Sequence, residues 1–399
     1  MSSILKNYFP MIRERQAVID EINHNTFLSA RFNTWTLEEQ KKFLDYCTGE
    51  RGMKITYDPF FKEIFEPDYN PERLNNMLSS IFGQQVVIIK VLSNDGARIS
   101  SETSLLITDI LVQLEDGGLV NVEIQKIGYA FPGERASCYS ADLLLREYRR
   151  LRDKNKRKFR YSDIKPVYTI VIFEESPNEI RKAKDYYIHR SEISFDTGIN
   201  VNLLQKYIFI SLDNFREIMH NRFEAIKSDA IKKTSTDDKG INEADTRLFH
   251  NKLEEWLMFL SFDEPEYIEQ LVTHNPYFKE LYADIYDMCL NTERLMEMYS
   301  KELAELDRNT VTYMIDELKA EVDILREERD KTITEIDNQK AKLDSQKAKL
   351  DSQKAKLDSQ KAELDSQKAE IDKISKERDL ANNEIQRLKD LLSKNGINA

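Results

Sequence analysis

The chain has 399 residues, enough for two or three domains, and its 40% apolar content is enough for a sizeable core. Its formal net charge is −12, which excludes a polycation that coats nucleic acid, so any DNA binding needs a local basic patch. Only 11 Gly and 9 Pro occur, which argues against collagen, Pro/Gly-rich disorder and a turn-dense β-sandwich. Three scattered cysteines, no signal-like leader and no apolar run of membrane-spanning length predict a soluble cytoplasmic protein.

The sequence pattern changes three times along the chain. We expect a helical N-terminal segment at 1–56, an α/β domain at 57–215, a helical region at 216–310 and a heptad-repeat tail at 311–399. In the first segment, Thr36 and Glu39 form a capping box that should start a helix. In the third, the core is expected to include Trp256, Leu257, Phe259 and Leu260.

The α/β domain should hold a mixed sheet flanked by helices. Helix patterns cover 58–65, 71–82 and about 133–152. Short β-branched runs bounded by Gly, Asp or Pro predict strands at 86–92, 105–114, 119–125, 167–173 and 207–212. The expected order is two helices, three strands, a helix and a strand, with a last strand after a longer gap.

Polar side chains interrupt two of these strands. Asp109 lies within the apolar run 105–112, where a buried carboxylate is costly unless it is paired or binds a metal. In the next strand Asn121, Glu123 and Gln125 share one face, because side chains alternate along a strand. These residues are either a site or simply the outer face of a half-exposed hairpin.

The turn between the two strands decides whether the acids meet. A three-residue loop of Asp116, Gly117 and Gly118 would pair Leu111 with Glu123 and Asp109 with Gln125. Asp109 and Glu123 would then be diagonal neighbours, about 7–8 Å apart. From that distance two carboxylates can share one Mg²⁺ ion.

Asp109, the glycine-turn hairpin and Glu123-Ile-Gln125 together resemble the PD-(D/E)XK nuclease superfamily. More narrowly, the sequence is similar to the PD-(D/E)XK nuclease family transposases, the recombination-promoting nuclease group. The resemblance covers about 57–215, and an ordered set of segments carries it: 58–65, 72–82, 120–125, 135–140, 166–171 and 208–215. It implies a restriction-endonuclease-like α/β core and a Mg²⁺-dependent DNA endonuclease, with Mn²⁺ as an alternative cation.

The resemblance also implies roles for single residues. Asp109 and Glu123 would hold the cation, while Gln125 stands where many superfamily members carry a water-orienting Lys. The acid that family members carry on the first helix would be Glu72, with Asp58 as a rival. Because Gln125 adds no positive charge, a catalytically weak or inactive DNA-binding or scaffold protein is the alternative function.

Basic residues after the third strand are candidates for DNA contact. Arg135 and Tyr139 are an i,i+4 pair on the expected helix, with Arg146 on the same stripe, and they either contact phosphate or pack the helix on the sheet. The range 146–165 holds ten Lys or Arg and three acids, a local charge of +7 that includes Arg152, Lys156 and Arg157. This segment either binds the DNA backbone or is a solvated loop.

The tail repeats a seven-residue unit, Gln-Lys-Ala-Lys-Leu-Asp-Ser, from Gln339 onward, which predicts a coiled coil. One register runs from Leu318 to Leu392, with apolar a positions but Gln at five consecutive d positions and Lys at many e and g positions. We expect weak self-association through 318–392, with a solvated spacer helix as the alternative.

Overall fold

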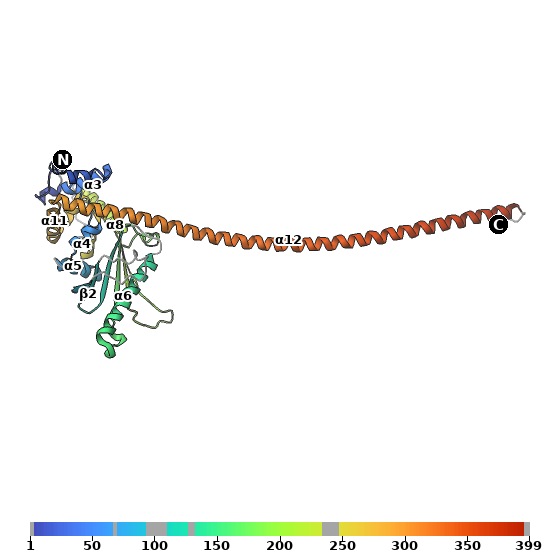
Figure 1. Ribbon diagram of the computed structural model, residues 1–399, viewed down its shortest axis with the longest axis horizontal. Helices are drawn as coiled ribbons and strands as arrows, with labels where there is room; N and C mark the ends of the chain where they lie inside the picture. Colours follow the sequence, from blue (N-terminus) through green and yellow to red (C-terminus); the bar gives the residue numbers. More distant parts are fainter. Residues whose placement is uncertain (1–3, 67–69, 93–109, 127–131, 234–246, 395–399) are drawn as a thin grey trace. The chain divides into compact units, whose positions relative to one another are not determined.

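The computed structural model describes residues 4–66, 70–92, 110–126, 132–233 and 247–394 (Figure 1). The chain divides into two compact units, Met1–Glu317 and Leu318–Ala399. The first unit holds a six-stranded sheet and its helices, and the second is the continuation of helix α12 (Thr292–Lys394). The expectation of a mixed α/β architecture followed by a long C-terminal helix is confirmed.

The N-terminal segment is helical, as expected. It contains η1 (Ile4–Asn7), α1 (Arg15–His24), α2 (Thr26–Phe32) and α3 (Leu37–Thr48). The predicted capping box starts α3: Thr36 Oγ1 accepts from the Glu39 amide at 3.3 Å, and Glu39 Oε2 accepts from the Thr36 amide at 2.6 Å. This cap satisfies amide groups that the first helical turn leaves without partners.

The helices α4 (Asp58–Ile64) and α5 (Pro71–Phe82) form where the sequence predicts them. Pro71 is the first residue of α5, where a missing N–H does no harm. The helix buries residues at a spacing of three and four, which are Leu74, Met77, Leu78 and Ile81. It ends at Gly83, whose φ of 70° is a left-handed C-cap conformation that favours glycine.

The six strands have the order β1-β2-β3-β4-β6-β5. Their bounds are β1 Ile88–Val91, β2 Ile110–Leu114, β3 Leu119–Gln125, β4 Val167–Phe173, β5 Ile188–Arg190 and β6 Gln205–Ser211. The central β3, β4 and β6 are mutually parallel, whereas β1, β2 and β5 join antiparallel. The sequence prediction missed β5, because three residues are too few to carry a periodic signal.

The β2–β3 hairpin has the expected three-residue turn, but the predicted register is wrong. Leu111 lies opposite Asn121 rather than Glu123, so the turn is Glu115–Gly117. Gly117 takes the left-handed conformation, with φ of 88°. Asp116 fixes this choice, because its Oδ1 accepts from the Gly118 amide at 2.8 Å, and the Gly118 carbonyl then accepts from Leu114.

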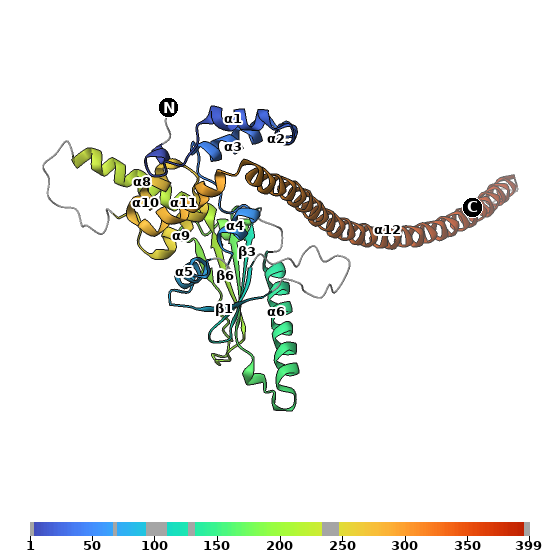
Figure 2. The same ribbon diagram turned by 60° about the vertical axis from the view of Figure 1, so that its left-hand side comes forward.

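Different helices cover the two faces of the sheet (Figure 2). Helix α6 (Pro132–Asn155) packs on one face and leads through η3 (Lys156–Lys158) and η4 (Tyr161–Asp163) to β4. The other face joins the main core with α5 and the C-terminal helices, which are α8 (Leu212–Lys233), α9 (Lys252–Ser261), α10 (Pro265–His274), α11 (Pro276–Cys289) and the start of α12. A short α7 (Asn178–Arg181) follows β4. The predicted core residues Trp256, Leu257, Phe259 and Leu260 are all buried.

Within residues 318–394 the second unit is one α-helix, and its apolar a positions face solvent within the single chain. Leu343, Leu350, Leu357 and Leu364 are between 52% and 64% exposed. None of the helices in the described ranges combines the length and apolar character that a bilayer-spanning helix needs.

Candidate active site

A row of three polar side chains points from β3 toward α6. Asn121, Glu123 and Gln125 alternate with Val120 and Val122, which face the main core on the opposite side. The strand β3 lies between β2 and β4 in the sheet, and α6 packs over this face. The three polar residues are accordingly only 0%, 6% and 4% exposed. The alternation read from sequence is therefore correct, but this polar face is buried rather than half-exposed.

Helix α6 covers this row of polar side chains. It buries Ala136, Tyr139, Ser140, Leu143 and Glu147, which share one stripe. Arg135 Nη2 donates to the Tyr139 hydroxyl at 3.1 Å, so the predicted i,i+4 pair is formed. On the sheet, Gln125 Nε2 donates to Glu123 Oε1 at 3.1 Å. The structure thus gathers four sequence-predicted site residues: Glu123, Gln125, Arg135 and Tyr139.

Burial dominates the electrostatics of the cluster. It raises the pKa of Glu123 to about 7, because the carboxylate loses its hydration. The Gln125 amide, the Arg135 guanidinium and the nearby Tyr139 hydroxyl oppose this shift, but less strongly. Burial likewise raises the pKa of Tyr139, which therefore stays a neutral hydroxyl. A carboxyl group that titrates near neutral pH is typical of functional sites.

Several buried atoms of the cluster have no hydrogen-bond partner among the described residues: Glu123 Oε2, Gln125 Oε1, Thr169 Oγ1 and both polar atoms of the Asn121 amide. An unsatisfied buried polar group costs roughly 1–3 kcal/mol. The carboxylate and amide oxygens are the kind of donor that a hard divalent cation prefers, so the residues present fit Mg²⁺. Within the described ranges, no three His, Cys, Asp or Glu side chains converge as a complete ligand set. Asp109, the other expected ligand, lies outside the described residues.

Glu72 and Asp58, the rivals for the remaining acidic position, lie elsewhere. Glu72 is exposed in the first turn of α5, the helix on the opposite face of the sheet. Its negative charge adds to the burial that raises the pKa of Tyr277. The Asp58 carboxylate pairs with Lys62 at 2.8 Å. No hydrogen bond or ion pair among the described residues joins either acid to Glu123.

A buried ion pair nevertheless connects the Asp58 turn to the end of β3. Lys126 pairs with Glu302 of α12, and their side chains are only 7% and 0% exposed. The backbone amide of Asp58 donates to the same Glu302 carboxylate at 3.0 Å. Lys126 therefore points away from Gln125, as the alternation predicts, and fixes the strand end to the helical core. No sequence pattern pointed to Glu302, which lies 176 residues from its partner.

The basic residues lie farther from Glu123. Arg146 pairs with Asp142 at 2.6 Å, and Arg152 donates to the Tyr148 hydroxyl at 2.9 Å. Lys156 and Arg157 are exposed in η3, and no ion pair holds them within the described chain. Helix α6 rises 1.5 Å per residue, which puts Arg152 about 20 Å from Tyr139. The structure therefore separates the predicted DNA-contact residues into a pair beside Glu123 and a basic group in the C-terminal half of α6 and in η3, here named the basic end of α6.

Two buried residues of the cluster are absent from the residues assigned from sequence. The sequence pattern places Asn121 on the polar face but indicates no role for it. Thr169 lies directly opposite Asn121 in the parallel β3–β4 register, and it is 0% exposed. The sequence signal for Thr169 is a small hydroxyl side chain inside the apolar run 167–173. Only the strand register shows that Thr169 lies beside Asn121.

Comparison with known families agrees with this geometry. A sequence model described as PD-(D/E)XK nuclease family transposase matches residues 55–314, which include the sheet, α6 and the helices up to α12. Comparison with curated proteins and with solved structures gave no match. The match spans more than half of the chain and contains the Glu123–Gln125 cluster. The chain belongs to the PD-(D/E)XK nuclease family transposases.

Proposed function

We propose that this protein is a Mg²⁺-dependent DNA endonuclease whose sheet and flanking helices form a PD-(D/E)XK core. The observation that carries the proposal is the desolvated Glu123 carboxylate, placed beside Gln125 and covered by Arg135 and Tyr139. Family membership supports a nuclease-type activity on DNA. The unpartnered oxygens of Glu123 and Gln125 fit a hard cation.

In this proposal Asp109 and Glu123 hold the cation. Asp109 directly precedes Ile110 in the sequence, and Ile110 pairs across the hairpin with Val122, the residue that directly precedes Glu123. A divalent cation held there would lower the pKa of a bound water molecule and would neutralise the charge that develops on the phosphate. Mn²⁺, which also accepts oxygen ligands, should substitute for Mg²⁺.

The other residues of the cluster position the reactants. The Gln125 amide can accept a hydrogen bond from a water and so orient it, but it adds no positive charge. Arg135 supplies that charge from α6, and a guanidinium matches the geometry of phosphate oxygens. Glu72 and Asp58 remain the proposed alternatives for an additional acid, and Asp58 is linked to the end of β3 through Glu302.

Cation binding should depend on the ionisation of Glu123. A ligand carboxylate must lose its proton, and burial has raised the pKa of this one to about 7. Affinity for Mn²⁺ should therefore increase from pH 6 to pH 8. A nearby cation stabilises the ionised carboxylate, so binding and deprotonation assist each other.

The basic end of α6 and the tail extend the proposal beyond the site. Arg146, Arg152, Lys156 and Arg157 would contact the DNA backbone, and the local positive charge in an acidic chain supports this role. The exposed a-position leucines of the second unit support self-association of residues 318–392 as a coiled coil.

One observation favours a second function, a catalytically weak or inactive DNA-binding scaffold. Gln125 is neutral at the position where many superfamily members carry Lys. The two functions separate in one experiment, in which a labelled duplex is bound in EDTA and Mn²⁺ is then added. Retardation followed by cleavage supports the endonuclease, and retardation without cleavage supports the scaffold. Absence of binding would contradict both.

A further inference from the structure

The segment between β5 and β6 carries an apolar face that stays exposed. Residues 192–203, here named the arm, alternate strictly between polar and apolar side chains, interrupted only by Thr197 near the turn. The apolar ones are 37–56% exposed: Ile193, Phe195, Ile199, Val201 and Leu203. A period of two is typical of a strand with one buried face.

The arm nevertheless forms no strand within its own chain. Its backbone carries one turn, in which the Gly198 amide donates to the Phe195 carbonyl at 2.9 Å. Gly198 has φ of 74°, the left-handed conformation of a three-residue hairpin turn. The arm therefore has the sequence and the turn of a hairpin, but no surface within the described ranges buries its apolar face.

The neighbouring strand β5 is an open edge of the sheet. The Ser191 amide donates to the Tyr207 carbonyl, and the Ser211 amide donates to the Tyr187 carbonyl, both at 2.9 Å. In an antiparallel pair such bonds recur at every second residue, so the peptide groups of Ile188 and Arg190 point away from β6. An edge of this kind can accept another strand.

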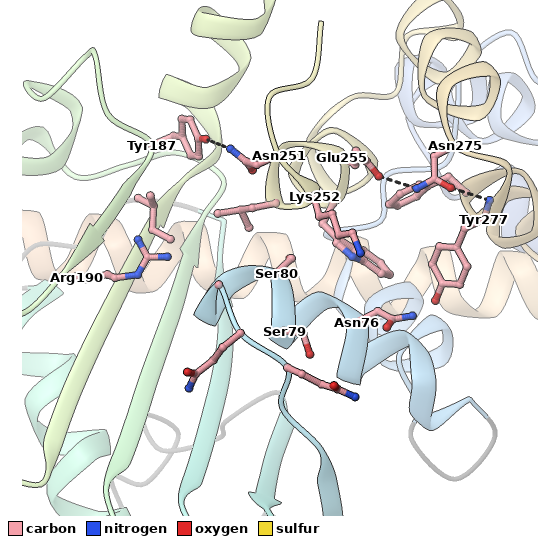
Figure 3. A pocket seen from close by; sticks show the side chains of 17 residues that line it. Asn76, Ser79, Ser80, Tyr187, Arg190, Asn251, Lys252, Glu255, Asn275 and Tyr277 are labelled. Carbon is pink, nitrogen blue, oxygen red and sulfur yellow. Dashed lines mark hydrogen bonds between the residues drawn. The ribbon is translucent and has the colours of Figure 1, made fainter. Parts of the chain in front are cut away.

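A cavity of about 830 Å³ opens beside these two residues (Figure 3). Tyr187 and Arg190 border it on the sheet side, and Lys252 and Tyr277 border it on the helical side. Its apolar wall includes Leu253, Trp256 and Phe278. The arm, which lies within the described residues, does not line the cavity of its own chain. The cavity thus offers an apolar surface next to a free strand edge.

The charges of the two surfaces are complementary. The arm contains Glu192 and Asp196 and no Lys or Arg. At the cavity, Lys252 is exposed and forms no ion pair with any described residue, while Arg190 donates one bond to the Ile81 carbonyl at 2.6 Å. The acidic arm is poorly suited to a nucleic acid partner. The two cations at the cavity outnumber Glu255, the one acid among its lining residues, and therefore attract the arm.

We propose that the arm of a second copy of this chain docks along β5 and inserts its apolar side chains into the cavity. Two copies related by a two-fold axis would each give an arm and receive one, which is a closed, isologous arrangement. The cavity is lined by α5, on the sheet face opposite Glu123, so the proposed active site stays accessible. This interface is independent of nuclease activity and of the coiled-coil tail.

A photocrosslinker in the full-length chain tests the interface. In Phe195→p-benzoylphenylalanine, irradiation should give a covalent dimer whose adduct maps to 76–85, 187–190, 251–256 or 275–278, the segments that line the cavity. Mixing isotopically heavy and light chains shows whether the adduct joins two copies. The matched control is Asn202→p-benzoylphenylalanine, which carries the probe on the polar face of the arm and should give little of this adduct.

A charge reversal tests the complementarity. Lys252→Glu should lower the yield of the Phe195 adduct roughly tenfold, corresponding to a loss of about 1.4 kcal/mol. Lys279→Glu, an equal change at an exposed lysine of α11 outside the cavity, should leave the yield unchanged. An adduct within one chain, an adduct elsewhere on a second copy, or uncrosslinked chain alone would each overturn the proposal.

Discussion

Replacing Glu123 by Gln should stabilise the protein in a pH-dependent way. Burial raises the pKa of the folded carboxyl to about 7 from an ordinary value of 4.5. At pH values between 4.5 and about 7, the Glu123 carboxyl group keeps its proton in the folded state and loses it in the unfolded state. Wild-type stability therefore falls as pH rises through this window and stays lower above it. The amide in the Glu123→Gln variant would be neutral at every pH and would escape the loss.

The size of the effect follows from the shift. A difference of about 2.5 pKa units corresponds to about 3 kcal/mol at 1.36 kcal/mol per unit. The Glu123→Gln variant should therefore exceed the wild type by up to about 3 kcal/mol in unfolding free energy at pH 8. Near pH 4 the carboxyl group is largely protonated in both the folded and the unfolded state, and the difference should be close to zero.

Denaturant unfolding in EDTA at pH 4.5, 6 and 8 measures this difference. The matched control is Glu147→Gln, which changes a carboxylate that is 2% exposed but accepts two hydrogen bonds from Arg150, at 2.7 and 2.8 Å. That variant should be destabilised at pH 8, because it loses a charge-assisted interaction. If Glu123→Gln gains nothing at pH 8, or gains equally at all three pH values, burial does not control this carboxyl group.

Further outcomes are expected elsewhere in the chain. Asp109→Ala should abolish plasmid nicking, and nicking at the wild-type rate would remove Asp109 from the site. Reversing Arg152, Lys156 and Arg157 to Glu should weaken DNA binding and reduce the slope of log affinity against log salt by about three, whereas an unchanged slope would make the segment a solvated loop. Lys126→Met should cost about 3–5 kcal/mol in denaturant unfolding, because it removes the buried cation that pairs with the Glu302 carboxylate. Adding Glu302→Leu should restore only part of the loss, because the Asp58 amide then loses its acceptor; equal stability of the wild type and the single variant would refute this. Deleting 346–359 preserves the heptad register and should leave the oligomeric state unchanged in sedimentation, whereas deleting 371–399 should shift the protein toward monomer. A full-length chain that is monomeric at tens of micromolar would make the tail a spacer helix.

Most strands and helices of the α/β domain could be predicted from local patterns, because side-chain alternation and the Pro and Gly residues at element ends directly restrict the backbone. Val120 and Val122 alternate with Glu123, and only a strand puts them on opposite faces. In α5, Pro71 and Gly83 mark the two ends, so its bounds match the prediction. The expectation of a mixed α/β sheet rests on such local signals.

The features that sequence reasoning missed depend on contacts between distant segments. The hairpin register turned on whether Gly117 or Gly118 takes the left-handed conformation, which the Asp116 side chain decides. Both choices preserve the face that Glu123 occupies, so the polar row was predicted even though its partner residues were wrong. The depth of burial depends on the packing of α6, since alternation alone cannot distinguish a covered face from an exposed one.

Cleavage of supercoiled plasmid is the measurement that tests the central claim most directly. Wild type and Glu123→Gln are compared side by side with Mg²⁺, with Mn²⁺ and with EDTA. The account predicts nicking by the wild type with either cation, none in EDTA, and none by Glu123→Gln under any condition although its fold is at least as stable. Equal nicking by the two proteins, or cation-independent nicking by the wild type, would contradict a metal-dependent endonuclease centred on Glu123.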